Sequence, residues 1–202
     1  MRVVGGEFRS RRLKTLPGRS VRPTSDRLRE TLFNILGEEV AGKVFVDAYA
    51  GSGAVGIEAL SRGAERVVFI ENDRAAATVV RENLRALGLE NRAVVVTRPA
   101  AAALAGLEAD IVFLDPPYEK TGEYEAALRL LGQAPPALVV AEHAKGADLA
   151  AAYGDLERVR ILRQGDSRLS FYRPAARCHS ERSEEPAVPA RPGAADPSLR
   201  SG

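Results

Sequence analysis

Residues 44–53, Val44-Phe45-Val46-Asp47-Ala48-Tyr49-Ala50-Gly51-Ser52-Gly53, decide the fold of this 202-residue chain. The three apolar residues at the start predict a buried strand. The glycines that follow predict a tight loop, because glycine adopts backbone angles that other residues avoid. A helix is predicted from Ala54 to Arg62, and Gly63 ends it. A strand, a glycine-rich loop and a helix in this order are typical of the first unit of an α/β sheet.

The alternation of strands and helices continues along the chain. Apolar runs predict further strands at residues 67–70, 93–97, 111–114 and 138–142. Helices are predicted between them, at about residues 73–87, 100–104 and 123–131. This alternation predicts a doubly wound, Rossmann-like α/β sheet that is mostly parallel and has right-handed crossovers.

The pattern changes after residue 142. A weak helix is expected near residues 148–153. Apolar stretches at residues 156–162 and 168–172 are separated by Gln164-Gly165-Asp166, which predicts a C-terminal antiparallel hairpin.

Composition divides the chain into three segments. Residues 1–23 are rich in arginine, glycine and proline, which predicts a basic N-terminal arm or hairpin rather than a helix. Residues 24–173 hold the α/β domain. Residues 174–202 carry prolines among Ser, Arg, Glu and Ala with almost nothing apolar to bury. This last segment is therefore predicted to be a disordered, dispensable tail.

The basic arm predicts a polyanionic partner. Residues 1–29 hold nine Lys or Arg against Glu7 and Asp26, although the net charge of the whole chain is only +2. A basic arm on a mildly acidic body favours nucleic acid as the partner. A solvated arm without a partner is the alternative. The residues predicted to contact phosphates are Arg9, Arg11, Arg12, Lys14, Arg22 and Arg27.

A helix is predicted to follow the arm. Thr24 or Ser25 would cap its start, and Gly37 would end it. The face opposite its apolar stripe carries Arg27, Arg29 and Asn34. We expect that face to belong to a nucleic-acid surface or to solvent.

Composition also excludes several classes of protein. The single Cys178 excludes an intramolecular disulfide framework, and its neighbour His179 has no further ligands nearby in sequence, so no metal site is expected. No apolar run approaches the ~18 residues of a membrane-spanning helix. A cytoplasmic protein fits this cysteine usage best, and we expect a monomer.

Residues at the ends of the first two strands predict a cofactor site. The glycines of the first loop let the backbone approach a ligand, and the start of the next helix offers unpaired N–H groups. Glu71 ends the second strand, where its carboxylate can accept both hydroxyls of a ribose. A nucleoside-like cofactor is therefore expected, and the residues predicted to hold it are Asp47, Tyr49, Gly51, Ser52, Gly53, Glu71 and Asn72.

Two classes of cofactor match the glycine loop. Gly51-Ser52-Gly53-Ala54-Val55-Gly56 fits the G-x-G-x-x-G fingerprint of nicotinamide dinucleotides. That fingerprint begins directly after its strand, whereas here Asp47 precedes the first glycine by four residues. A carboxylate there would face a pyrophosphate badly but can bind an amino group. S-adenosylmethionine, with a ribose, an amino-acid end and no phosphate, fits Asp47 and Glu71 better, and a nicotinamide oxidoreductase is the alternative.

Asp115-Pro116-Pro117-Tyr118 follows the fourth predicted strand. In open α/β sheets, ligands bind at the carboxyl ends of the strands. Proline fixes φ and lacks an N–H, so this turn is stiff and its carbonyls can accept hydrogen bonds. A carboxylate, carbonyls and an aromatic ring held together suit a flat molecule that bears an amine. A strand-ending turn with a buried tyrosine is the plainer alternative.

These motifs resemble those of class I methyltransferases that act on an amino nitrogen. More narrowly, residues 1–173 resemble the RsmD family, in the stretches Arg2-Val3-Val4-Gly5-Gly6, Arg22-Pro23-Thr24, Arg27-Leu28-Arg29-Glu30-Thr31-Leu32-Phe33-Asn34 and Gly51-Ser52-Gly53-Ala54-Val55-Gly56-Ile57-Glu58-Ala59-Leu60-Ser61-Arg62-Gly63-Ala64. RsmD enzymes methylate N2 of a guanine in bacterial 16S ribosomal RNA. The resemblance implies that reaction, with S-adenosylmethionine as cofactor and ribosomal RNA as partner. An adenine-N6 methyltransferase on RNA or DNA is the alternative, because the motif fits an amine rather than one base.

For this reaction, Asp115 and the Pro116 carbonyl are expected to accept the hydrogens of the amine, and Tyr118 to stack on the base. Such acceptors favour a pyramidal nitrogen whose lone pair points at the methyl group. No metal is expected, because the sulfonium is already activated. The chain departs from the family pattern at Pro99, where these enzymes usually have Asp or Asn. The adenine is then expected to be recognised by neighbouring backbone, such as the N–H of Ala100, or by apolar packing.

Overall fold

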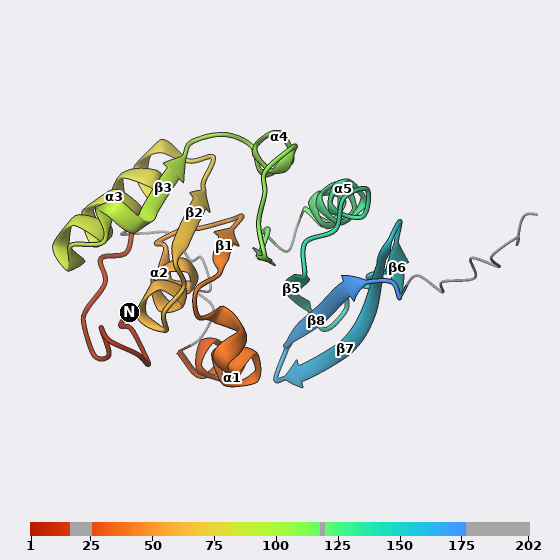
Figure 1. The fold of residues 1–202 in the computed structure, drawn as a ribbon, viewed down its shortest axis with the longest axis horizontal. Coiled ribbons are helices and arrows are strands. Elements are labelled where there is room, and N and C mark those ends of the chain that lie inside the picture. Colours follow the sequence, from red (N-terminus) through yellow and green to blue (C-terminus); the bar gives the residue numbers. More distant parts are fainter. Residues whose placement is uncertain (17–25, 118–119, 177–202) are drawn as a thin grey trace, which may run out of the picture.

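The strands join in one mixed sheet. The computed structural model describes residues 1–16, 26–117 and 120–176. Within these ranges the strands are β1 (Val44–Asp47), β2 (Arg66–Ile70), β3 (Ala93–Val96), β4 (Ile111–Leu114), β5 (Leu138–Ala144), β6 (Ala152–Tyr153), β7 (Leu156–Gln164) and β8 (Ser167–Pro174). Their order across the sheet is β3-β2-β1-β4-β5-β8-β7-β6 (Figure 1).

Helices cover both faces of this sheet. They are α1 (Asp26–Leu36), α2 (Ala54–Ser61), α3 (Arg74–Leu87), α4 (Ala100–Leu104) and α5 (Thr121–Leu131), with short 3-10 helices η1 (Gly37–Val40) and η2 (Glu90–Arg92). α1, α2 and α3 contribute to the core on one face, and α4 and α5 to the core on the other. Successive strand residues alternate between the two, with Phe45 in the first core and Val46 in the second.

The sheet is doubly wound, as predicted. β1 to β5 pair in parallel, and β1 lies between β2 and β4, so the chain changes direction across the sheet at β1. The carboxyl ends of β1 and β4 are thus neighbours at the switch point, where ligands bind in such sheets. β7 and β8 form the predicted antiparallel hairpin, with strands longer than expected, and β8 also pairs antiparallel with β5.

The prediction of a helix near residues 148–153 is wrong. Ala152–Tyr153 forms β6, which pairs with the first residues of β7. The Tyr153 hydroxyl accepts a hydrogen bond from the Ala150 N–H at 2.9 Å and donates to Glu125 of α5 at 2.7 Å. The segment is held by these tertiary contacts, which a local apolar spacing does not reveal.

The N-terminal segment, residues 1–16, folds back on itself. Arg2 and Arg12 form an antiparallel bridge. Val3 and Leu13 are 1% and 6% exposed and belong to the core that α1, α2 and α3 share. The segment is therefore packed on the domain, although its arginines remain at the surface.

Some predictions concern residues outside the described ranges. These are the cap at Thr24 or Ser25, the contacts of Arg22 and Tyr118, the Cys178-His179 pair and the tail from residue 177 onward. β8 ends at Pro174, the first residue of the predicted tail.

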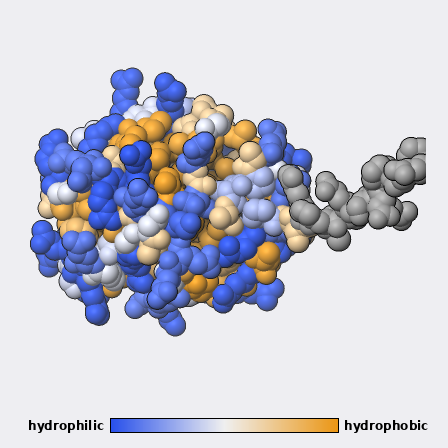
Figure 2. Space-filling model, viewed as in Figure 1, coloured by the Kyte–Doolittle hydropathy of each residue, from blue (hydrophilic) through white to orange (hydrophobic). Residues whose placement is uncertain are grey.

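The surface of the described residues is largely polar. Hydrophilic residues cover most of the face shown in Figure 2, and the large hydrophobic side chains that are exposed in the described ranges are Val94, Val159 and Ile161. Among the helices described, none has the length and apolar character needed to cross a membrane.

Candidate active site at the carboxyl edge of the sheet

The glycine loop, residues 48–53, follows β1 and lies between the ends of the two strands that flank it, β2 and β4. The Ala48 N–H donates to the Phe113 carbonyl of β4 at 3.0 Å. The Ala50 N–H donates to the Ile70 carbonyl of β2, also at 3.0 Å. The loop is thus tied to β4 on one side and to β2 on the other, which places it beside the residues that follow both strands.

Three glycines shape this loop and the helix after it. Gly53 has a φ of 79°, in the left-handed region that favours glycine. At Gly56, a Cβ would lie 2.3 Å from Phe69 Cε1, so only glycine lets α2 approach β2 this closely. At Gly51, a Cβ would meet no heavy atom within 4 Å. The loop therefore packs tightly on one side and borders open space at Gly51.

Asp47 is buried at the end of β1. It is 2% exposed, and its Oδ2 accepts a hydrogen bond from the Gly56 N–H at 2.9 Å. Burial raises the pKa of the Asp47 carboxyl from 3.8 to about 7, the hydrogen bond from Gly56 opposes that rise, and the nearby charge of Glu71 adds to it. In this structure the carboxylate joins β1 to the first turn of α2.

Glu71 lies beside the glycine loop, as its place at the end of β2 predicted. Its Oε2 accepts from the Gly51 N–H at 2.8 Å, and its Oε1 accepts from the Asp73 N–H at 2.7 Å. The side chain is partly exposed, and Asn72 next to it is exposed. Each carboxylate oxygen has a second lone pair, so Glu71 can accept further hydrogen bonds from a ligand.

Tyr49 connects the glycine loop to α5. Burial raises the pKa of its hydroxyl, and a hydrogen bond to Glu123 raises it further. Glu123 lies in the first turn of α5, directly after the turn that Asp115 begins. The loop that follows β1 is thus joined to the first turn of α5.

The Asp115 turn begins where β4 ends. Asp115 is partly exposed, Pro116 is buried and Pro117 is exposed. The Pro117 carbonyl accepts from the Lys120 N–H at 2.8 Å. The Pro116 carbonyl lies 3.4 Å from the hydroxyl of Tyr124 in α5. A backbone contact from Lys120, which caps α5, and a side-chain contact from Tyr124 of α5 therefore hold this turn, in addition to its two prolines.

Ala100 lies at the same edge, beyond Glu71. It begins α4 after β3 and is 5% exposed. The Glu71 N–H donates to the Val96 carbonyl at 3.0 Å, which keeps the ends of β2 and β3 together. The predicted cofactor residues thus follow the neighbouring strands β3, β2 and β1, and Asp115 follows β4 next to them.

The residues predicted to contact phosphates lie mainly on the N-terminal segment. Arg9, Arg11, Arg12, Lys14 and Arg27 are exposed. The Lys14 Nζ pairs with Glu82 of α3 at 3.0 Å.

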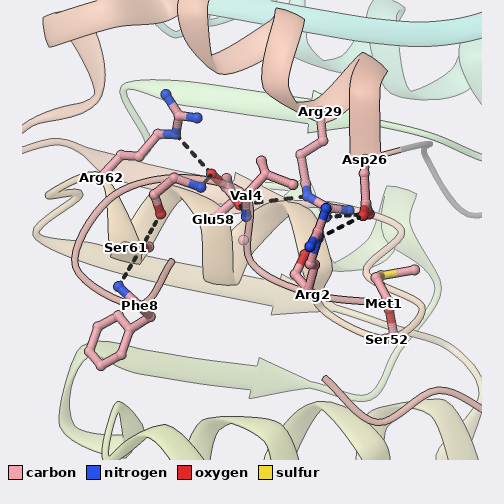
Figure 3. A network of polar contacts seen from close by, with 12 residues as sticks. Met1, Arg2, Val4, Phe8, Asp26, Arg29, Ser52, Glu58, Ser61 and Arg62 are labelled. Carbon is pink, nitrogen blue, oxygen red and sulfur yellow. Dashed lines mark hydrogen bonds and ion pairs between the residues drawn. The ribbon is translucent and has the colours of Figure 1, made fainter. Parts of the chain in front are cut away.

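The prediction that Arg29 lies on an exposed face of α1 is wrong, because its side chain is buried. It is 0% exposed. Its Nη2 donates to the Arg2 carbonyl at 2.5 Å and to Asp26 at 2.9 Å, and its Nε lies 3.6 Å from Glu58 Oε2 (Figure 3). The helical position of Arg29 is as predicted. Besides Asp26 of the same helix, its partners Arg2 and Glu58 lie in segments far away in the sequence.

Glu58 of α2 is a buried acid that the sequence reading missed. Its two oxygens accept from the N–H groups of Val4 and Gly5, both at 2.8 Å. Arg62 donates to it at 2.9 Å (Figure 3). Ser61, three positions later at the end of α2, accepts from the Phe8 N–H at 2.9 Å through its hydroxyl oxygen. The glutamate lies within the stretch that resembles the RsmD family, and that resemblance is the one signal that pointed to it.

An apolar hollow of about 410 Å³ lies at the opposite end of β4. Its lining includes Leu104, Ala109, Val112, Leu131 and Pro136. None of the predicted site residues that the structure describes lines it.

Comparison with known proteins identifies the family of this chain. A family model described as conserved hypothetical protein 95 matches residues 1–173. The chain is 37% identical to the protein YlbH of Bacillus subtilis (strain 168) over 182 residues, which are 86% of this chain and 98% of YlbH. It is 43% identical to ribosomal RNA small subunit methyltransferase D of Escherichia coli (strain K12) over 133 residues, which are 65% of this chain and 66% of that protein.

Solved structures show the same fold. The Escherichia coli protein yhhF, described as a methyltransferase, has a TM-score of 0.77 at 33% identity, and the match covers 87% of this chain and 98% of that one. An RNA methyltransferase from Salinibacter ruber in complex with S-adenosyl-L-homocysteine has a TM-score of 0.60 at 19% identity, over 76% and 94% of the two chains. With the family model matching residues 1–173, this chain belongs to the RsmD family.

Proposed function

We propose that this protein methylates the exocyclic N2 of a guanine in 16S ribosomal RNA. As a member of the RsmD family it is an S-adenosylmethionine-dependent ribosomal RNA methyltransferase. The Escherichia coli relative, by its name, acts on the RNA of the small subunit. The guanine, its N2 and the roles of single residues are the parts that we propose.

The glycine loop and Glu71 suit the nucleoside part of the cofactor. Gly51 borders open space, and Glu71 lies against the same loop with lone pairs left to accept hydroxyl groups. The ribose of S-adenosylmethionine offers two neighbouring hydroxyls to such a carboxylate. Tyr49, Ser52, Gly53 and Asn72 line the same edge, and we assign the adenine to the neighbourhood of Ala100.

We expect Asp47 to contribute to cofactor binding mainly through its charge. The carboxylate is 2% exposed and already accepts the Gly56 N–H. A cationic amino group near it would favour the ionised form, which burial disfavours in its absence. We therefore assign Asp47 to the amino-acid end of the cofactor, where it also keeps the first turn of α2 in place.

The Asp115 turn is proposed to orient the amine. S-adenosylmethionine, when bound, supplies an electrophilic methyl group. The Asp115 carboxylate and the Pro116 carbonyl would accept the two N–H groups, which directs the nitrogen lone pair away from them. Tyr118 would stack on the base. Holding the reacting atoms in line can contribute about 7–11 kcal/mol to lowering the barrier. The proton that the nitrogen finally loses needs only a weak acceptor.

One observation carries the proposal. The glycine loop is bonded to β4 through the Ala48 N–H and the Phe113 carbonyl, and Asp115 follows Phe113 by two residues. The proposed cofactor residues and the proposed amine acceptor are thus neighbours at the switch point of the sheet. The exposed arginines of the N-terminal segment supply positive charge for RNA. A cytoplasmic location and a monomeric state remain predictions of the sequence.

The test uses the purified chain, an unmodified 16S ribosomal RNA transcript or small subunits, and S-adenosylmethionine. We expect N2-methylguanosine in the digested RNA. Asp115→Ala should abolish turnover and leave the affinity for S-adenosylhomocysteine nearly unchanged, because the residue contacts the amine rather than the cofactor. Glu108→Ala, an exposed acid at the opposite edge of the sheet, is the matched control and should keep full turnover.

Other outcomes separate the alternatives. N6-methyladenosine in place of N2-methylguanosine would contradict the choice of base but keep the amine chemistry. Turnover that survives Asp115→Ala would remove the role given to that residue. Calorimetric binding of NADH but not of S-adenosylhomocysteine would favour an oxidoreductase and contradict the methyltransferase assignment.

A further inference from the structure

Asn83 is a polar residue on the apolar face of α3. The other buried residues of this helix are Ala76, Ala77, Val80 and Leu84. Asn83 is 2% exposed. A buried amide destabilises a fold unless its donors and its acceptor are hydrogen-bonded. Its partners therefore indicate what this position does.

The Asn83 amide holds two separate segments. Its Oδ1 accepts from the Lys14 N–H at 2.8 Å, and its Nδ2 donates to the Lys14 carbonyl at 3.1 Å. Nδ2 also donates to the Ser52 carbonyl at 3.0 Å. Both N–H groups and the carbonyl of the amide are thereby used. One side chain thus joins the N-terminal segment to the glycine loop.

Two further contacts link the same parts of the molecule. The Ser52 hydroxyl lies 3.5 Å from the sulfur of Met1 (Figure 3). At Gly53, a Cβ would lie 3.2 Å from Val80 of α3, so the helix also packs against the glycine loop about one turn before Asn83. The N-terminal segment at Lys14 and the glycine loop at Ser52 therefore share one side-chain anchor, Asn83.

We propose that Asn83 is a positioning residue that couples RNA binding to cofactor binding. The inference rests on the proposed function, because it takes the N-terminal segment as an RNA contact and the glycine loop as the cofactor site. Arg9, Arg11 and Arg12 are exposed directly before Lys14. Phosphates that fix these side chains also fix the Lys14 backbone, and the amide of Asn83 transmits that constraint to Ser52.

Coupling between two binding sites is reciprocal. RNA that orders the N-terminal segment should tighten cofactor binding, and the cofactor should tighten RNA binding by the same factor. Couplings of this kind typically amount to about 5–150-fold in affinity. The protein would then hold its cofactor most firmly when the RNA is in place.

The experiment measures the Kd of S-adenosylhomocysteine by calorimetry, for the full chain alone and with saturating unmodified 16S ribosomal RNA transcript. For the wild-type protein we expect an affinity about five-fold or more higher with RNA. Asn83→Leu has a similar volume, fits the apolar face and makes none of the three hydrogen bonds. For this variant we expect the ratio of the two Kd values to fall to about one.

Controls separate coupling from stability. Glu82→Gln removes the ion pair to the Lys14 side chain but leaves Asn83 intact, so its ratio should match that of the wild type. A merely structural Asn83 would lower the melting temperature and weaken both affinities, with the ratio unchanged. If the Asn83→Leu protein does not fold, Asn83→Asp is used in its place. Asn83→Asp keeps the acceptor for the Lys14 N–H but loses both donors of the amide.

Two results would overturn the inference. One is a ratio of about one in the wild-type protein, which means no coupling exists. The other is a folded Asn83 variant whose ratio of the two Kd values equals that of the wild-type protein, which means that the coupling takes another route. A wild-type protein that binds neither S-adenosylhomocysteine nor RNA would instead contradict the proposed function.

Discussion

Buried acids connect the elements around the site at the scale of single residues. Asp47 accepts an N–H from Gly56, and Glu58 accepts those of Val4 and Gly5. A carboxylate in the interior is stable only with such partners. Removing a partner leaves a buried charge uncompensated, so these residues are where substitutions have the largest effects.

Because of Asp47, the free energy of unfolding should decrease as the pH rises. The pKa of its carboxyl is raised from 3.8 to about 7 in the folded protein, so the folded state binds more protons than the unfolded state between these values. The stability that this group contributes is fully present below about pH 4 and is lost as the pH rises through about 7. Asp47→Asn cannot titrate. The free energy of unfolding of the wild type minus that of the variant should fall by about 2 kcal/mol between about pH 5 and pH 7.

Urea unfolding of both proteins across this pH range checks the prediction. Taking the difference cancels the titration of all other groups. A difference that stays constant with pH would mean that Asp47 is ionised in the folded protein at low pH as well.

Arg29 is predicted to be far more important for stability than its neighbour on the helix. Arg29→Met leaves the buried Glu58 without one of its cations and the Arg2 carbonyl without its donor, which should lower the free energy of unfolding by about 3–5 kcal/mol. Arg27→Met, at an exposed position of the same helix, should change it by less than about 0.5 kcal/mol. Equal effects of the two substitutions in urea unfolding would contradict the importance of the buried network.

The sequence could not predict the burial of Arg29, although it predicted the helix. Its partners Arg2 and Glu58 lie 27 and 29 residues away, and one-dimensional patterns treat an arginine as a surface residue. Asp47 and Glu71, in contrast, could be placed from the sequence. They follow strands, and the carboxyl ends of parallel strands meet at one edge.

The N-terminal segment is the element whose structure says most about the partner. Its backbone is anchored by Glu58, Ser61 and Asn83, while Arg9 and Arg11 remain exposed. This combination suits a surface that binds phosphates at fixed positions. A flexible arm would lose more conformational entropy on binding.

Replacing Arg9, Arg11 and Arg12 together by alanine should weaken RNA binding and reduce its dependence on salt. Three lost phosphate contacts correspond to a change of about 2 in the slope of log K against log salt. Filter binding of 16S ribosomal RNA at several salt concentrations measures this slope. Arg85→Ala with Arg129→Ala, on α3 and α5, is the control and should leave the slope nearly unchanged. An unchanged slope in the triple variant would reduce the segment to a packing element.

Elements with a clear periodic pattern could be predicted, and those fixed by tertiary contacts could not. α3 has the stripe, the Asp73 cap and the terminal Gly88 of a typical helix. The region of residues 148–153 has apolar residues at helical spacing. Its Tyr153 is nevertheless bound by Glu125 and paired with β7, and these contacts favour an extended chain.

At the scale of the whole molecule, two features come together. One is the switch point of the parallel strands at β1 and β4, and the other is the basic N-terminal segment, which packs on the domain. β1 and β4 bring the glycine loop and the Asp115 turn together, and α2 and α3 carry the side chains that anchor the N-terminal segment. We propose that this arrangement serves methyl transfer to a guanine amine of 16S ribosomal RNA.

The most direct test is mass spectrometry of nucleosides from 16S ribosomal RNA of cells with and without the gene. We expect N2-methylguanosine to fall by one residue per RNA in cells lacking the gene. The wild-type gene should restore the residue, and the Asp115→Ala variant should not. An unchanged content of N2-methylguanosine, or the loss of N6-methyladenosine in its place, would contradict the proposed function.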